Sequence, residues 1–310
     1  MIPWSFTGDL PLAGVWSLEE SERYCLRMAS SHYENFPVVM RVFDEQVRRS
    51  LGAIYAFART ADDFADEQRF EGVRLELLDV WAKQLEECFA GRPRHPVFIA
   101  LAAAAERHGL EARPFRDLLS AFRQDCVKNR YGHMDELHDY CSRSANPVGR
   151  LVLRVMGQES RRAIELSDRT CTALQLANFW QDLSVDIPRG RLYVPLEAAA
   201  RWGLTETDLR RRRRTGGWDG LVHELVGEAR SLMQSARALP LAVNLTGAFY
   251  LEAVQRGGLR ILDEVDRLGG KAAFRRPKLR KRDAASIFMR TSAATLTTAP
   301  LRLAAVHRMV

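Results

Sequence analysis

The 310-residue sequence lacks the long apolar runs and leader patterns of membrane and exported proteins. A membrane-spanning helix needs about 18 or more consecutive apolar residues. The two most apolar stretches, 239–254 and 284–306, are each interrupted by proline and by charged side chains. The N-terminus has no basic segment followed by an apolar one, as a signal peptide would have. The sequence therefore predicts neither a membrane span nor a signal peptide.

Cysteine is also scarce and irregularly placed. The cysteines are odd in number, and no two are spaced as C-x-x-C. This pattern argues against a disulfide framework or a zinc site and indicates a reducing compartment, so we expect a cytoplasmic protein. The five are Cys25, Cys88, Cys126, Cys141 and Cys171.

The common nucleotide-binding and hydrolase motifs are missing as well. No G-x-G-x-x-G follows a strand, and Gly269-Gly270-Lys271 lacks the first glycine and the Ser or Thr of a phosphate-binding loop. Neither H-E-x-x-H nor G-x-S-x-G occurs. His133 and His138 are close in sequence, and a surface pair explains them best. None of the chemistries that these motifs carry is indicated.

The sequence does contain helical patterning along nearly its whole length. Strand-like alternation is limited to Leu192-Tyr193-Val194. We predict one all-α domain over residues 1–310 with a central cavity, a loose segment at 1–16 and a tail at 299–310. One predicted helix begins after Asp44 and carries the first aspartate pair, and another is capped by Ser167 and ends near Pro188. A helix over 134–156 is predicted to break at Asn146-Pro147. The other predicted helices are 17–31, 73–90, 97–108, 114–128, 219–238, 241–267 and 283–298.

Two of these helices carry aspartates spaced four residues apart. The first pair is Asp62 and Asp66, and the second is Asp182 and Asp186. Residues four apart share a helix face, where like charges repel by roughly 0.2–0.5 kcal/mol. A cation between the carboxylates removes that repulsion, and Mg²⁺ commonly binds one or two carboxylates together with substrate phosphates. Two such faces would hold a diphosphate through Mg²⁺.

Each aspartate pair continues a longer polar strip. Tyr55 and Arg59 precede the first pair at spacings of four and three residues, within roughly 60° of arc, beside an apolar face. Gln175 and Asn178 precede the second pair in the same way. A single strip is explained most simply as a solvated helix face. Its repetition favours a site wall.

At these positions the sequence resembles the squalene/phytoene synthase family. Residues 53–63 resemble its first aspartate-rich region, and residues 175–186 resemble the second. The resemblance extends over about residues 24–282 and implies the all-helical isoprenoid-synthase fold, Mg²⁺ as cofactor and prenyl diphosphates as substrates. The order of the family's middle signature is followed by Asp125, Arg130, Tyr131, Glu136, Leu137, Tyr140 and Cys141.

The resemblance also implies roles for single residues. Carboxylates and an amide would hold the metal, polar and aromatic side chains would bind the substrate, and two tyrosines would act on the reacting cation. In that order they are Asp62, Asp66, Asn178, Asp182 and Asp186 for the metal; His32, Phe36, Arg59, Gln175 and Arg275 for the substrate; and Tyr55 and Tyr140 for catalysis, with Phe36 and Phe57 as further aromatic candidates beside ordinary core packing.

Two stretches, 34–38 and 144–153, resemble the bacterial hopanoid-pathway branch, the hydroxysqualene synthases. This resemblance implies conversion of presqualene diphosphate and water to hydroxysqualene and diphosphate. The alternatives are a presqualene-diphosphate, squalene or phytoene synthase, or a non-catalytic assembly protein, although the latter would be expected to lose metal aspartates. Gly257-Gly258 stands where several relatives have a tyrosine, so we expect room or water access there.

Basic residues exceed acidic ones, for a net charge of +7. They concentrate in Arg210–Arg214 and in Lys271–Arg282, where seven of twelve residues are basic. A solvated loop and peripheral contact with anionic lipid on the inner face of the membrane are the two favoured explanations. Nucleic acid is the least favoured partner, because no nucleic-acid motif accompanies the charge.

Overall fold

The computed structural model describes residues 16–32, 42–213 and 215–306, without the side chains of Ser31, His32, Lys281, Leu296 and residues 298–306. The predicted residue Phe36 and the stretch 34–38 lie outside this part of the chain. Within it, helices account for the regular structure, and an isolated parallel bridge joins Arg130 to Leu192. The all-α prediction is confirmed. The single domain with a central cavity stays a prediction, since the chain divides into two compact units, Met1–Val127 and Lys128–Val310.

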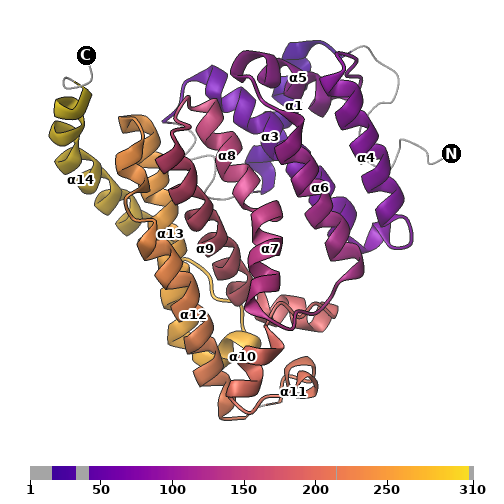
Figure 1. Cartoon of the computed structure of the whole chain (residues 1–310), viewed down its shortest axis with the longest axis vertical. Helices are drawn as coiled ribbons and strands as arrows, with labels where there is room; N and C mark the ends of the chain where they lie inside the picture. The colour runs from indigo at the N-terminus through magenta and orange to yellow at the C-terminus, as the bar shows by residue number, and fades with distance from the viewer. Residues whose placement is uncertain (1–15, 33–41, 214, 307–310) are drawn as a thin grey trace. The chain divides into compact units, whose positions relative to one another are not determined.

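The first unit packs its helices around α3. The core beside α3 is aromatic: Phe57 is fully buried, stacks on Trp81 at 6.1 Å between ring centroids, and meets Phe98 and Phe115 edge-on. Phe57 is therefore a core residue. The helices of this unit are α1 (Leu18–His32), α3 (Glu45–Asp66), α4 (Arg74–Phe89), α5 (Pro96–His108) and α6 (Ala112–Val127), with a 3₁₀ turn η2 (Gln68–Phe70) (Figure 1).

The second unit is built on α9, which packs against α8, α12 and α13. Its helices are α7 (Met134–Ser144), α8 (Asn146–Val155), α9 (Arg161–Asp186), α10 (Leu196–Arg201), α11 (Glu206–Arg210), α12 (Gly217–Ser235), α13 (Leu245–Leu268) and α14 (Lys281–Val306), with 3₁₀ turns η3 (Ile187–Arg189), η4 (Leu239–Ala242) and η5 (Gly269–Ala273).

Local capping chemistry sets several helix starts as predicted. Asp44 accepts a hydrogen bond from the Val47 N–H at 2.8 Å and begins α3. Ser17 and Glu20 form a reciprocal capping box before α1. The break at Asn146-Pro147 is also confirmed, because α7 ends at Ser144 and α8 begins at Asn146.

The predicted start of the second aspartate helix is wrong. Ser160 caps α9 by accepting a hydrogen bond from the Ala163 N–H at 3.2 Å, and Ser167 lies two turns inside the helix. Ser167 is buried, and the backbone of α8 approaches it at Gly149. The short helices α10 and α11 were not predicted either. Among the described residues, no helix is long and apolar enough to cross a bilayer.

Candidate active site

The first candidate face lies on α3. Tyr55, Arg59, Asp62 and Asp66 are each half-buried on one strip of the helix. The strip borders the buried residues of α3, so these polar groups lie at the edge of the core rather than on a fully solvated face. His32, the predicted substrate residue at the end of α1, has no described side chain.

Arg59 links the aspartates of this face. Its guanidinium lies 2.6 Å from Asp63 and 3.5 Å from Asp62. Burial lowers the pKa of Arg59, but the charges of Asp63 and Asp62 outweigh it, so the pKa is raised. The sequence reasoning passed over Asp63, although its position four residues after Arg59 was the signal for this pair.

Carboxylates crowd Asp62. Its side chain keeps 47% of its surface accessible to solvent, yet it stands against enough protein to be partly desolvated. Desolvation is the largest cause that raises the pKa of Asp62; Arg59 opposes it and the charges of Asp66, Asp63 and Asp125 add to it, for a net pKa of about 6. Asp125, near the end of α6, thus belongs to the surroundings of the site. A cation bound here would favour the ionised form of each carboxylate.

The second candidate face lies on α9. Gln175, Asp182 and Asp186 are half-buried and Asn178 is exposed, whereas the opposite side of the helix is buried. The described structure therefore gives both predicted strips the same character: oxygen-bearing side chains at the border of a packed helix. The strip on α3 belongs to the first unit, and the strip on α9 belongs to the second.

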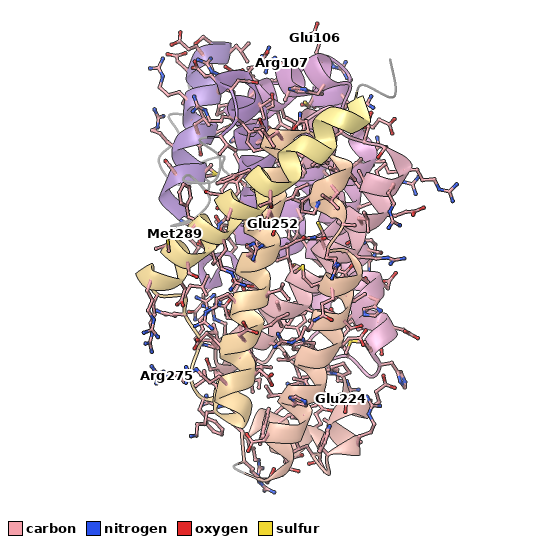
Figure 2. All side chains as sticks on the ribbon, turned by 90° about the vertical axis from the view of Figure 1, so that its left-hand side faces the viewer. Glu106, Arg107, Glu224, Glu252, Arg275 and Met289 are labelled. Carbon is pink, nitrogen blue, oxygen red and sulfur yellow. The ribbon has the colours of Figure 1, made fainter. Side chains whose placement is uncertain are left out.

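A segment between η5 and α14 crosses this second face. The Arg276 guanidinium forms a two-pronged ion pair with Asp182, in which its NH2 nitrogen lies 3.1 Å from the carboxylate. Gln181 donates a hydrogen bond to the Pro277 carbonyl at 2.9 Å. Sequence reasoning chose Arg275, which is exposed (Figure 2), whereas the structure places its neighbour on the aspartate. Arg275 and Arg276 lie in the same run of basic residues, so the local sequence gave no signal that distinguishes them.

Tyr140 lies in an aromatic cluster of the second unit. Its ring is 5.9 Å from Phe179 of α9, 6.2 Å from Tyr193 and 6.3 Å from Tyr131. Phe179 and Tyr193 stack at 4.0 Å. Of these four rings, only Tyr140 was predicted to be catalytic. Phe179, next to Asn178 in sequence, ties this cluster to the helix of the second aspartate pair.

The two glycines on α13 differ in their surroundings. A Cβ at Gly258 would lie 2.6 Å from Leu174 and 2.9 Å from Met233, so this glycine permits close packing against α9 and α12. A Cβ at Gly257 would meet nothing within 4 Å. The expectation of open room therefore holds for Gly257 and is wrong for Gly258.

The donor set suits Mg²⁺. Among the described residues, no group of three or more His, Cys, Asp or Glu side chains is arranged to hold a metal ion. Mg²⁺ does not require one, because it usually binds one or two carboxylates and completes its shell with water and phosphate oxygens. The mutual repulsion around Asp62 and the oxygen-rich α9 face fit such a hard cation.

Comparison with known proteins decides the family. The squalene/phytoene synthase family model matches residues 18–283. The chain belongs to this family. Among its members, a phytoene synthase of Arthrospira platensis is 31% identical over 261 residues, which cover 80% of this chain and 84% of that protein. Chloroplastic phytoene synthase 1 of Zea mays is 31% identical over 264 residues, or 83% and 64% of the two chains.

Solved structures of the family share the fold. The crystal structure of squalene synthase HpnC from Alicyclobacillus acidocaldarius matches with a TM-score of 0.77 and 38% identity, covering 81% of this chain and 95% of that one. A dehydrosqualene synthase matches with a TM-score of 0.82 and 20% identity, covering 90% and 98%. The helices described above therefore form the all-α isoprenoid-synthase fold of a squalene/phytoene synthase family enzyme.

Proposed function

We propose that this protein converts presqualene diphosphate and water into hydroxysqualene and diphosphate, with Mg²⁺ as cofactor. The observation that carries the proposal is the 38% identity to a squalene synthase, higher than the 31% to the phytoene synthases above. The stretch 144–153, which resembles hydroxysqualene synthases, supports the same branch. It runs from the last residue of α7 through most of α8, where Asn146 is buried and accepts a hydrogen bond from Thr172 of α9 at 3.0 Å.

In this proposal both aspartate faces serve the departure of diphosphate. The ligands of Mg²⁺ would be Asp62, Asp66, Asn178, Asp182 and Asp186. Bound Mg²⁺ would supply Lewis-acid stabilisation of the leaving diphosphate. Arg59 and Arg275 would bind diphosphate oxygens, and Gln175 and His32 would orient the substrate by hydrogen bonds.

The remaining residues would control the cation. The carbon–oxygen bond breaks, diphosphate leaves with the electron pair, and the resulting carbocation rearranges. Tyr55 and Tyr140 would stabilise it through their ring faces, by roughly 0.5–2 kcal/mol each. The oxygen of one water then bonds to carbon, and the proton released can pass to diphosphate. No reductant enters this balance.

A phytoene synthase is the second candidate, because the curated relatives cited above carry that name. Such an enzyme would join two C20 diphosphates. Peripheral contact with anionic lipid is also proposed, since the prenyl substrate and product partition into bilayers and the chain is basic.

Product analysis tests the proposal. Purified protein with Mg²⁺ and presqualene diphosphate should give a C30 alcohol with or without NADPH, and ¹⁸O from labelled water should enter the alcohol. Squalene formed when NADPH is supplied would indicate a squalene synthase. Consumption of C15 or C20 diphosphates with presqualene diphosphate left intact would indicate one of the other condensing enzymes. Asp62→Asn, assayed in parallel, controls for contaminating activity.

A further inference from the structure

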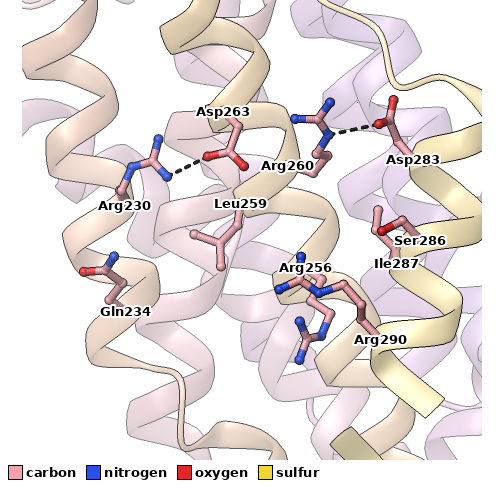
Figure 3. Close-up of a pocket in the computed structure, with 10 residues that line it drawn as sticks. All are labelled: Arg230, Gln234, Arg256, Leu259, Arg260, Asp263, Asp283, Ser286, Ile287 and Arg290. Carbon is pink, nitrogen blue, oxygen red and sulfur yellow. Dashed lines mark hydrogen bonds and ion pairs between the residues drawn. The ribbon is translucent and has the colours of Figure 1, made fainter. Parts of the chain in front are cut away.

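A pocket of about 270 Å³ opens between α12, α13 and α14 (Figure 3). The residues that line it are well separated in sequence from both aspartate pairs. Four arginines and two aspartates line it, which leaves two positive charges in excess. None of these residues belongs to the proposed active site. The lining comprises Arg230, Gln234, Arg256, Leu259, Arg260, Asp263, Asp283, Ser286, Ile287 and Arg290.

One end of the pocket is neutralised by internal ion pairs. Arg230 donates to Asp263 at 2.7 Å, and Arg260 donates to Asp283 at 3.0 Å. Both pairs are drawn in Figure 3 and occupy the side of the pocket nearer the start of α14. This end holds its own countercharges.

The other end brings two guanidinium groups together. Arg256 and Arg290 both line this part of the pocket, and neither is joined to a lining aspartate in Figure 3. Arg256 reaches Glu252 with one nitrogen at 2.5 Å, outside the pocket lining, while its Nε is buried and makes no hydrogen bond within the described structure. Adjacent guanidiniums repel, and each presents planar N–H donors that match phosphate oxygens. An anion between them would satisfy both.

The outward face of α14 beside this end is apolar. Met289 has 65% of its surface exposed and Phe288 has 58%, and the Phe288 ring contacts Phe249 at 5.8 Å. At 100° per residue, Met289 lies midway between Phe288 and Arg290 and on the side of α14 opposite the buried Thr291. Figure 2 looks onto α14 and labels Met289 there. We call Arg256, Phe288, Met289 and Arg290 the α14 surface.

We propose that the α14 surface binds a membrane, with the phosphate of an anionic phospholipid headgroup held between Arg256 and Arg290. A phosphate group is the shared chemistry of a lipid headgroup and of the free ion. The exposed Met289 and Phe288 favour the lipid, because only acyl chains would remove their apolar surface from water. This inference locates the proposed lipid contact and does not depend on which prenyl diphosphate is the substrate.

Flotation with vesicles tests the proposal. The full chain should float with phosphatidylcholine vesicles containing phosphatidylglycerol and much less with phosphatidylcholine alone. Arg256→Gln/Arg290→Gln should weaken binding by about tenfold or more, and Arg290→Gln alone by about fivefold, as expected for basic residues near an anionic surface. Met289→Ser should weaken binding at both low and high salt.

Matched variants keep the test specific. Arg92→Gln/Arg113→Gln removes the same charge from two exposed arginines outside the basic clusters and should leave flotation unchanged. Equal flotation of wild type and Arg290→Gln would overturn the proposal, as would loss of flotation only in a variant of the 271–282 segment. Binding of inorganic phosphate that needs Arg256 and Arg290, without vesicle binding, would show a free-anion site instead. Turnover of detergent-solubilised substrate should be unchanged in the Arg256, Met289, Arg290 and matched control variants, which separates this proposal from the catalytic one.

Discussion

The carboxylates of Asp62 and Asp182 lie in two different electrostatic environments. Asp62 stands among Asp63, Asp66 and Asp125, and its pKa is raised to about 6. Asp182 is paired with Arg276, a cation that the protein itself supplies. Both carboxylates are thus suited to accept a further cation. At Asp62 the cation would relieve repulsion, and at Asp182 it would displace the Arg276 guanidinium.

Removing one metal carboxylate should abolish most turnover. We expect Asp62→Asn and Asp182→Asn each to lower kcat by at least about 100-fold, because groups that only support metal ligands already contribute about 10–100-fold. Volume is conserved, so circular dichroism should be unchanged. Asp79→Asn, at an exposed carboxylate on α4, is the control. Near-wild-type activity of both site variants, or full activity in chelator, would exclude the metal assignment.

Arg276 should compete with a metal ion at Asp182. Because exposed ion pairs contribute roughly 0.2–1 kcal/mol, Arg276→Gln should tighten Mn²⁺ binding to the substrate-free protein by up to about fivefold. Titration calorimetry at low salt measures the effect. Arg275→Gln, one residue away and exposed, should leave it unchanged. Identical affinities in the wild type and both variants would mean that Arg276 does not restrict access to Asp182.

At the scale of helices, Gly149 sets how closely α8 approaches α9. A Cβ there would lie 2.4 Å from the Ser167 Oγ and 2.5 Å from the Cys171 Sγ. Gly149→Ala should therefore lower the free energy of unfolding by about 1–3 kcal/mol, as overpacking does. Gly227→Ala, at an exposed position of α12 with open space around it, should raise it by about 0.5–1 kcal/mol. Urea unfolding compares them, and the same sign for both would contradict the packing argument.

The start of α5 should make stability depend on pH. His95 caps this helix by accepting the Val97 N–H through Nδ1 at 3.2 Å, and burial lowers the pKa of His95 to about 4. An unfolded histidine titrates near 6.5, so between these values the unfolded chain binds the proton and the folded chain does not. The free energy of unfolding should therefore have its full value above about pH 6.5. It should fall by at most about 1.4 kcal/mol per pH unit as the pH drops toward 4.

His95→Asn provides the comparison for that pH profile. Asparagine can cap a helix but does not titrate. Denaturant unfolding of this variant should show a smaller slope of stability between pH 6.5 and 4 than the wild type. An unchanged slope would place the pH dependence elsewhere in the molecule.

For the whole molecule, burial should decide which thiols react. Burial raises the pKa of Cys25, Cys88 and Cys141 to about 12 and that of Cys171 to about 11. Thiolates are the reactive form, so these four should resist iodoacetamide at pH 8. Cys126 and Cys171 are both only partly buried; Cys126 should be labelled first, and Cys171 should follow slowly because its pKa is raised. Mass spectrometry of the native and urea-unfolded protein measures this, and rapid native labelling of Cys88 would contradict the packing described.

The sequence by itself determined the long helices, apart from the start of α9, and the spacing of the two aspartate pairs. Helix periodicity and caps such as Asp44 act over three or four residues, so the spacing of Asp62 from Asp66 is enough to place both on one face. The family followed from the same local stretches. Ser167 shows the limit of such local patterns. Serine often caps a helix, so it suggested a helix start, but Ser167 is buried inside α9 against α8.

Only the tertiary structure decided which charges meet. Arg276 reaches Asp182 across 94 residues, and nothing in the run of basic residues distinguishes it from Arg275. The ring cluster around Tyr140 and the pairing of arginines at the α14 surface likewise join separate helices. Helix periodicity fixes the direction of a side chain about its own axis, whereas packing between helices fixes its neighbours, and that packing depends on the whole chain.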